Sequence, residues 1–234
     1  MPKPPSCRAR VIAIRSLDPV VLEVDLAMLE PPEIAFEAGQ WVAIPLGEKI
    51  VRPYSMASPP SERRTIRLCV DVKPGGVGSR YFRELKAGDE VAFQPPLGTL
   101  TLGRDSTAPV LLAAEEIGIV PFRSILLAQA EQGFPRLMTL YFTAPARAYL
   151  TYHDELGRLA ADHARFHYRP LLSAPDPGWP GEVGSVLAVL EREAGDLRGH
   201  EALLCGGGDL VKAARELCLA RGLERKRIRY EKFW

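Results

Sequence analysis

The sequence has few cysteines and no local metal-binding motif. Its four cysteines are Cys7, Cys69, Cys205 and Cys218. None belongs to a Cys-x-x-Cys pair, so neither a zinc knuckle nor an iron–sulfur cluster is encoded locally. His163 and His167 form a His-x3-His pair, but no Cys, Asp-rich loop or Glu-x-x-His neighbour completes a coordination shell. We therefore expect reduced thiols and no bound metal.

An excess of charge of either sign is also lacking. The 30 basic residues nearly balance the 29 acidic residues, and such a balance disfavours binding to nucleic acid or to an anionic membrane surface. No uninterrupted apolar run reaches membrane-spanning length, and residues 1–6 have no apolar core typical of a signal peptide. The Gly-x-Ser-x-Gly motif of hydrolases is absent as well. These absences predict a cytoplasmic globular protein that binds no nucleic acid, inserts into no membrane and is not a hydrolase.

Short strand-like runs separated by turn residues fill the first hundred residues. They cover residues 8–16, 20–26, 40–46, 50–55, 65–72 and 90–94. This pattern predicts a small antiparallel β-barrel. One stretch with helical spacing, 80–85, follows a glycine-rich turn, with Ser79 as its expected N-cap and Gly88 as its stop. Pro95 and Pro96 are expected to end the last strand.

After Gly103 the pattern changes to alternating strands and helices. The predicted strands are 109–114, 137–142, 166–172, 202–205 and 227–233, and the helices between them are 122–132, 151–161, 186–194 and 210–220. Such alternation is typical of an α/β domain with a five-stranded parallel, Rossmann-like sheet. The sequence therefore predicts two domains, 1–103 and 104–234, with a polar boundary near 104–108.

Two motifs in the predicted barrel carry the most specific chemistry. Arg52-Pro53-Tyr54-Ser55 ends a predicted strand, and Gly76-Val77-Gly78-Ser79 lies in the glycine-rich turn. These motifs, their order and their spacing resemble the ferredoxin–NADP reductase family of flavoproteins. The resemblance covers nearly the whole chain and includes residues 36–42, 96–98 and 120–122.

The resemblance implies a bound flavin. In that family an R-x-Y-S motif, matched here by Arg52, Tyr54 and Ser55, holds the flavin. A guanidinium suits a phosphate, a tyrosine ring can lie against the isoalloxazine, and a hydroxyl can bond its reactive edge. The family's G-x-x-S motif is matched by residues 76–79, where free N–H groups suit a pyrophosphate, so the implied cofactor is FAD rather than FMN. Alternatively, the glycines form an ordinary tight turn and Arg52 is a solvated strand end.

The predicted nucleotide-binding turn departs from the family. Members carry a glycine pair and a threonine before G-I-A-P, where the pyrophosphate of a nicotinamide nucleotide docks. Here Glu115 and Glu116 replace both glycines, while Gly118 and Pro121 are kept. A carboxylate about 4 Å from a phosphate repels it by roughly 1 to 4 kcal/mol, which makes binding of NADH or NADPH doubtful. The glutamates can also occupy the anion site at the helix start themselves, or be simple surface variation.

Arginines that bind nucleotide phosphates in the family are missing as well. The corresponding positions read Thr143-Ala144-Pro145 and Ser173-Ala174. Arg147 or Arg169 could substitute for them from nearby.

The end of the chain keeps its match. Cys205-Gly206 stands where the family has a Cys-Gly pair facing the nicotinamide, and Glu231-Lys232-Phe233 resembles the terminal Glu-x-aromatic motif. The resemblance implies that Phe233, or Trp234 in its place, stacks on the flavin, with Ser55, Cys205, Glu231 and Phe233 as candidate catalytic residues. Alternatively, the two aromatic rings only pack the last strand and Cys205 is a buried small hydrophobe.

The function implied is an FAD-dependent oxidoreductase that transfers electrons between NADH or NADPH and a protein partner of ferredoxin-like, flavodoxin-like or oxygenase type. The basic segment 221–229, expected near the flavin edge, could steer an acidic partner or be a solvated face. Two alternatives stay open. One is an FAD-containing carrier that has lost nicotinamide nucleotide binding, and the other is a non-catalytic binding or assembly protein on the same fold.

Overall fold

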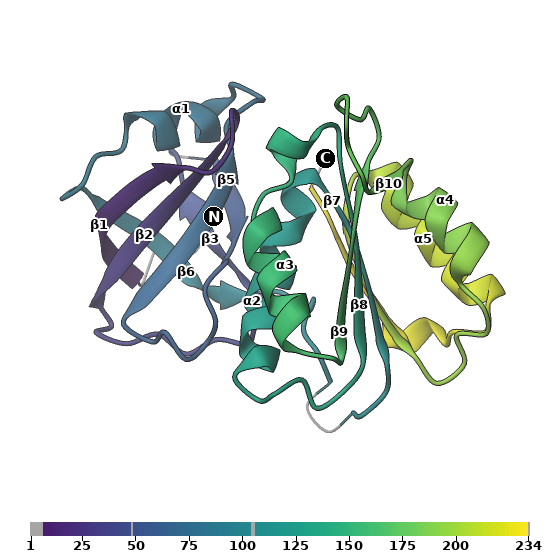
Figure 1. Cartoon of the computed structure of the whole chain (residues 1–234). Helices are drawn as coiled ribbons and strands as arrows, with labels where there is room; N and C mark the ends of the chain where they lie inside the picture. The colour runs from purple at the N-terminus through teal and green to yellow at the C-terminus, as the bar shows by residue number, and fades with distance from the viewer. Residues whose placement is uncertain (1–6, 48, 104–105, 234) are drawn as a thin grey trace. The chain divides into compact units, whose positions relative to one another are not determined.

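Two six-stranded sheets of opposite type make up the architecture, as the computed structural model shows for residues 7–47, 49–103 and 106–233 (Figure 1). Contacts divide the chain into two compact units: Met1–Thr101 with Val120–Ala128, and Leu102–Ile119 with Gln129–Trp234. The segment Val120–Ala128 thus belongs to the first unit. The predicted domain boundary between residues 103 and 104 stays a prediction, and residues 104 and 105 lie outside the described residues.

The sheet of the first unit is antiparallel throughout. Its strands are β1 (Cys7–Ser16), β2 (Val21–Glu30), β3 (Trp41–Pro45), β4 (Val51–Ser55), β5 (Thr65–Asp71) and β6 (Glu90–Leu97), in the order β4-β3-β6-β1-β2-β5. A bridge between Met56 and Leu68 joins the end of β4 to β5, and the Ala57 N–H donates to the Arg67 carbonyl at 2.7 Å. These bonds connect the two outermost strands, so the predicted antiparallel barrel is confirmed.

The barrel core follows the two-residue period of the strands. In β1 the side chains of Cys7, Ala9 and Val11 are buried, whereas those of Arg8 and Arg10 are exposed. Alternation of this kind places one face of a strand in the core and the other in solvent.

Two local predictions in this unit are wrong. Helix α1 (Val77–Glu84) begins two residues before Ser79, and its N-cap is Gly76, so Ser79 lies buried in the first turn. Strand β6 continues through Pro95 and Pro96 to Leu97. The ladder with β3 is irregular there, because Ala43 pairs with Gln94 and Trp41 with Leu97. Proline has no backbone N–H to donate to a neighbouring strand. The bulge tolerates Pro95 and Pro96 because the regular hydrogen-bond ladder with β3 is interrupted there.

The sheet of the second unit is parallel, as predicted. Its strands are β7 (Val110–Glu115), β8 (Met138–Ala144), β9 (Phe166–Leu172), β10 (Glu182–Val183), β11 (Glu201–Gly206) and β12 (Ile228–Lys232), in the order β10-β9-β8-β7-β11-β12. The two-residue β10, which pairs with the end of β9, adds a sixth strand to the five predicted. The sequence did not reveal β10 because a strand this short carries no periodic pattern.

Helices cover the parallel sheet and bury its strands. Helix α3 (His153–Asp162) lies on one face, and α4 (Val186–Glu193) and α5 (Gly208–Ala220) lie on the other (Figure 1). Helix α2 (Ile119–Ala130) follows β7. Val189 of α4 and Val211 of α5 share one apolar cluster with Leu111 and Leu204 of the sheet. Burial on both faces explains why the inner strands β7 and β11 are almost continuously apolar.

The described residues also bear on metal and membrane binding. All four cysteines are buried and none forms a disulfide. No cluster of three or more His, Cys, Asp or Glu side chains that could hold a metal occurs in the described part of the chain. His163 instead packs against the ring of Phe134, at 5.0 Å between centroids. Among the described residues, no helix is long and apolar enough to cross a membrane.

Candidate functional site

Strand β4 and helix α1 together position the predicted flavin-binding tyrosine. The ring of Tyr54 meets Phe82 of α1 edge to face, with 4.7 Å between centroids and 68° between planes. A Cβ added at Gly78 would lie 2.3 Å from the Tyr54 hydroxyl oxygen. Only glycine therefore fits at position 78, because the tyrosine hydroxyl occupies the space that a Cβ would need. Burial raises the pKa of Tyr54 to about 12, which keeps the hydroxyl protonated at neutral pH.

The hydroxyl of Ser55 is buried and has no hydrogen-bond partner among the described residues. The residue is 6% exposed. Leaving a buried hydroxyl unpaired costs about 1–3 kcal/mol, so such an atom fits a position where a ligand supplies the partner. Arg52 and Pro53, on the same strand, are exposed, and the Arg52 guanidinium donates to the Val51 carbonyl at 3.1 Å.

The start of α1 offers backbone donors to an anion. The N-cap of the helix is Gly76, which makes no side-chain cap hydrogen bond, and the first turn, which includes Val77, contains no acidic residue. Helix N-termini of this kind bind phosphate groups well. The unpaired Ser55 hydroxyl, the helix start without a side-chain cap and the exposed Arg52 guanidinium thus fit a flavin with its phosphates. The roles of the individual residues toward the flavin stay predictions.

In the second unit, the predicted nucleotide turn is held tightly against a neighbouring strand. Glu115 ends β7, and a short 3-10 helix, η1 (Glu116–Gly118), leads into α2, with Pro121 in its first turn. Glu116 has a φ of +47°, a conformation that glycine adopts more easily. A Cβ at Gly118 would lie 2.2 Å from the Cys205 carbonyl oxygen of β11. Only glycine allows this close backbone approach.

The carboxylate of Glu115 occupies a helix N-terminus, but not the one that the sequence suggested. Its Oε2 accepts a hydrogen bond from the N–H of Gly207, the N-cap of α5, at 3.2 Å. The sequence suggests instead the start of the helix after β7, which is α2. Gly207 was missed because only the pairing of β7 with β11 brings the two turns together.

Thr143 is a second polar residue at this edge of the sheet. It pairs in register with Glu115 on the neighbouring strand β8. The residue is 5% exposed, and its Oγ1 has no hydrogen-bond partner in the part of the chain that the structure describes. The sequence alone shows Thr143 only at the position of a missing family arginine, because its burial depends on the strand register.

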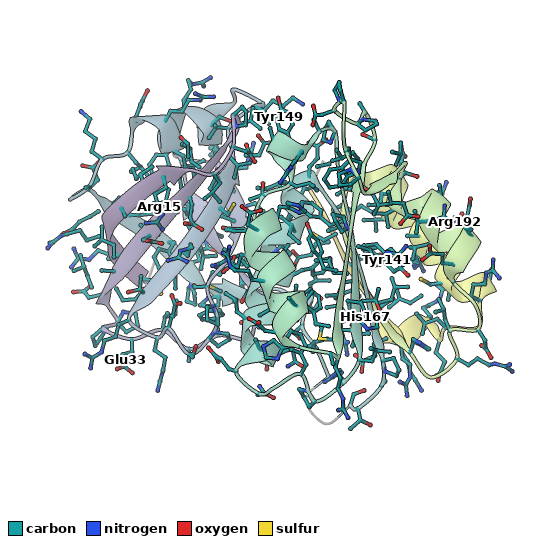
Figure 2. All side chains as sticks on the ribbon, in the orientation of Figure 1. Arg15, Glu33, Tyr141, Tyr149, His167 and Arg192 are labelled. Atoms are coloured by element: carbon teal, nitrogen blue, oxygen red, sulfur yellow. The ribbon has the colours of Figure 1, made fainter. Side chains whose placement is uncertain are left out.

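Arg169, one of the two arginines predicted to substitute for the missing ones, is held in ion pairs. Its guanidinium pairs with Glu182 at 2.8 Å and with Glu193 at 2.9 Å. Arg192 of α4, labelled in Figure 2, pairs with the same two carboxylates. Arg169 would have to exchange these ion pairs for a phosphate, so its predicted substitution for the missing arginine stays a prediction. Arg147, which is exposed in the 3-10 helix η2 (Arg147–Tyr149) after β8, stays a prediction.

The predicted residues of the last strand reach the same edge. Cys205 pairs in register with Glu231 on β12, and the Phe233 N–H donates to the Gly206 carbonyl at 3.1 Å. Cys205 is fully buried, and burial raises the pKa of its thiol. Phe233 is half-buried, and Trp234 lies outside the described residues. The proposed roles of these residues in catalysis or stacking stay predictions.

Most of the basic segment 221–229 precedes β12, at the opposite end of that strand from Phe233. Its predicted place near the flavin edge stays a prediction. The 3-10 helix η3 (Arg225–Arg227) precedes the strand, whereas Phe233 follows it. Part of its charge is also paired, because Lys226 contacts Glu224 at 2.9 Å. The pattern of basic residues gave no information on which end of the sheet they occupy.

Comparisons with known proteins agree with both units. Residues 12–102 match the family described as oxidoreductase FAD-binding domain, and residues 117–216 match the oxidoreductase NAD-binding domain. Ferredoxin–NADP reductase B of Sorangium cellulosum (strain So ce56) is 34% identical over 235 residues, which cover 96% of this chain and 96% of that protein. The reductase component of propane 2-monooxygenase from Rhodococcus jostii (strain RHA1) is 29% identical over 97% of this chain, but this chain spans 63% of its length.

Solved structures give the same result. A cytochrome P450 reductase from Amycolatopsis has a TM-score of 0.86 and 30% identity, covering 97% of this chain and 69% of that chain. A ferredoxin NADP+ reductase from Neisseria gonorrhoeae with bound FAD and NADP has a TM-score of 0.83 over 97% of this chain and 98% of that chain. Its identity of 19% supports the fold alone.

Proposed function

Because the chain belongs to the ferredoxin–NADP reductase family of flavoprotein oxidoreductases, with FAD as its cofactor, we propose that it transfers electrons between a nicotinamide nucleotide and a protein redox partner. FAD, when bound, links two-electron exchange with a nicotinamide to one-electron exchange with a partner. No group of three or more potential metal ligands occurs in the described residues, so the partner is proposed to carry the one-electron centre.

The residues of the first unit are proposed to hold and orient the flavin. Arg52 supplies a forked donor for a phosphate, and the start of α1 supplies backbone N–H groups for a second phosphate. Tyr54, fixed by Gly78 and Phe82, supplies a flat ring for the isoalloxazine. The unpaired Ser55 hydroxyl is the observation that carries this proposal. Ser55 directly follows Tyr54 in the chain, its side chain is buried, and its hydroxyl has no hydrogen-bond partner among the described residues.

The partner and the cellular location are finer proposals. One relative is named as a ferredoxin–NADP reductase and another as the reductase component of a monooxygenase. We therefore propose an acceptor of ferredoxin-like, flavodoxin-like or oxygenase type. A cytoplasmic location rests on the sequence alone and stays a prediction.

A second candidate function is supported by the nucleotide turn. Glu115 places a carboxylate at the start of α5, and Glu116 replaces a glycine in a left-handed conformation. Both features disfavour a bound pyrophosphate. They favour a flavin carrier that exchanges electrons only with protein partners.

Anaerobic titration of the FAD-loaded protein with NADH and with NADPH separates these candidates. Rapid bleaching of the flavin absorbance supports the nicotinamide-dependent reductase. A flavin that stays oxidised with both nucleotides but bleaches with dithionite contradicts it and supports the carrier. A purified protein that is colourless and takes up no FAD contradicts both and supports the non-catalytic alternative.

Arg52→Ala tests the proposed flavin site itself. Loss of a charge-assisted bond to a phosphate should weaken FAD binding about tenfold or more while the protein stays folded. The measurement is FAD content and affinity by absorbance after gel filtration. Arg64→Ala is the matched control, since Arg64 is an exposed arginine of the same unit that pairs with Glu33 at 3.2 Å. Equal FAD affinity in the two variants argues against the assignment of Arg52.

A further inference from the structure

We propose that Glu115 is a displaceable internal anion of the nucleotide site. Its carboxylate accepts the hydrogen bond of the Gly207 N–H when no nucleotide is bound. When a phosphate group accepts that hydrogen bond instead, the carboxylate moves and accepts one from the Thr143 hydroxyl. This inference rests on the proposed function, and it adds a residue that controls how tightly the nucleotide binds.

The sheet places the three groups in one row. Glu115 of β7 pairs with Thr143 of β8, and on the other side of β7, Ala114 pairs with Cys205, one residue before Gly206. Residues in register on adjacent parallel strands point to the same face of a sheet. Glu115 therefore has Thr143 on one side and the start of α5 on the other.

The start of α5 is a site that both a carboxylate and a phosphate can occupy. The helix has 13 residues, and its Gly207 N–H donates to Glu115 Oε2 at 3.2 Å. No side chain of β11 fills this space, because residue 206 is glycine, and a Cβ there would lie 2.9 Å from the Glu115 Cβ. The partial positive charge of a helix N-terminus stabilises either anion, so the two compete for one donor.

Thr143 provides the second position for the carboxylate. Its buried Oγ1 has no hydrogen-bond partner among the residues described, although buried hydroxyls normally have one. A hydroxyl can donate to a carboxylate, and a displaced Glu115 would otherwise lose its hydrogen bond without replacement. Thr143 therefore lowers the cost of moving Glu115 away from Gly207.

A second acidic residue at this helix end favours displacement of Glu115 by an incoming phosphate. Asp209 lies in the first turn of α5. A phosphate that entered while Glu115 stayed in place would meet two carboxylates. Moving Glu115 leaves only one of them at the phosphate.

A double-mutant cycle on the FAD-loaded protein tests the proposal. Glu115→Gln, Thr143→Val and the double variant are titrated calorimetrically with NAD+, NADP+ and inorganic pyrophosphate. Glu115→Gln should tighten binding about tenfold. Thr143→Val should weaken binding about threefold in the wild-type background and should have no effect in the Glu115→Gln background, because only a displaced carboxylate needs the hydroxyl.

Two control variants separate this role from a structural one. Glu116→Gln removes the neighbouring carboxylate and keeps the hydrogen bond between Gly207 and Glu115, so it should tighten binding clearly less than Glu115→Gln does. Thr143→Ser keeps the hydroxyl and should behave as the wild type does. If Glu115→Gln and Glu116→Gln have equal effects, or if Thr143→Val acts equally in both backgrounds, the proposal is wrong. It is also wrong if no variant binds any of the three anions.

Failure of the proposed function has a different signature. If NADH and NADPH do not reduce the flavin of any variant while pyrophosphate binding follows the expected cycle, nicotinamide-dependent reduction fails and the role of Glu115 stands. If NADH or NADPH reduces the flavin but the cycle shows no coupling between positions 115 and 143, only the role of Glu115 fails.

Discussion

Glu116 adopts a backbone conformation that costs an L-amino acid free energy. Its φ of +47° lies in the left-handed region, where the Cβ of any residue other than glycine is crowded. We expect Glu116→Gly to raise the free energy of unfolding by about 1 kcal/mol, measured by urea denaturation. Glu116→Ala is the control, because it removes the carboxylate and keeps the Cβ. Equal stability of the glycine and alanine variants would show that the backbone stores no strain here.

His153 makes stability depend on pH. Burial lowers the pKa of this histidine. Its Nδ1 atom lies 3.1 Å from the hydroxyl oxygen of Tyr168. The His153 imidazole is therefore protonated at a higher pH in the unfolded chain than in the folded protein. Above about pH 6.5 the group has no effect, and stability should fall as the pH drops below that value towards the lower folded pKa. Thermal unfolding between pH 8 and pH 5 measures the change.

His153→Gln is the variant that isolates this contribution, because glutamine does not titrate. Its melting temperature should decrease less between pH 8 and pH 5 than that of the wild type. A parallel decrease in both proteins would assign the pH dependence to other groups.

Single residues could be predicted from the sequence where their chemistry is local. The Arg52-Pro53-Tyr54-Ser55 motif and the replaced glycines at 115 and 116 are visible without any structure. The contact of Glu115 with Gly207 could not be predicted, because the two residues meet only through the pairing of β7 with β11. The burial of Thr143 depends on strand register in the same way.

At the scale of elements, β4 and α1 act as one support for the tyrosine ring. A Cβ at Gly78 would lie 2.3 Å from the Tyr54 hydroxyl oxygen, so Gly78→Ala must push the ring away from its position. We expect a loss of about 1–3 kcal/mol in stability and a lower FAD content, measured by denaturation and absorbance. Adding Tyr54→Phe removes the clashing oxygen and should restore most of the stability.

Gly76→Ala is the matched control for stability in this experiment. A Cβ at Gly76 meets no atom within 4 Å, so the variant should lose much less stability than Gly78→Ala does. If the two alanine variants are equally stable, the close approach of Tyr54 to Gly78 does not limit the packing of α1.

Element boundaries show where sequence patterns are informative. The predicted strand 166–172 matches β9 at both ends, where the apolar residues Phe166 and Leu172 begin and end the strand. Ser79 is a common N-cap residue, yet the helix begins earlier, since the glycine-rich turn lets Gly76 take that position. The two prolines of β6 are tolerated only because a bulge accompanies them, and a bulge has no signature in one strand alone.

At the scale of the whole molecule, the change of periodicity near Gly103 was enough to predict an antiparallel barrel and a parallel sheet. A period of two residues and an alternation of strands with helices specify these two sheet types. The bridge between Met56 and Leu68 closes the barrel, and it joins segments that share no sequence signal.

The basic segment at the amino end of β12 yields a prediction for partner binding. The five residues of β12 separate η3 (Arg225–Arg227), the part of this segment that precedes the strand, from Phe233 by about 16 Å. Replacing Arg225 and Lys226 by alanine should change the rate of electron transfer to a [2Fe–2S] ferredoxin less than twofold, measured by stopped-flow absorbance. A tenfold decrease that disappears at high salt would instead assign this segment to docking.

The buried cysteines have a practical consequence for measuring motion. Cys205 and Cys218 are at most 1% exposed, and burial raises the pKa of the Cys218 thiol to about 11. Cys7 and Cys69 are each 4% exposed. Thiol reactivity requires an accessible thiolate, so the native protein should react slowly with spin-labelling reagents. One cysteine introduced on the surface of each unit would then be labelled selectively, and the distance between the two labels could be followed by electron paramagnetic resonance while FAD and nucleotide are added.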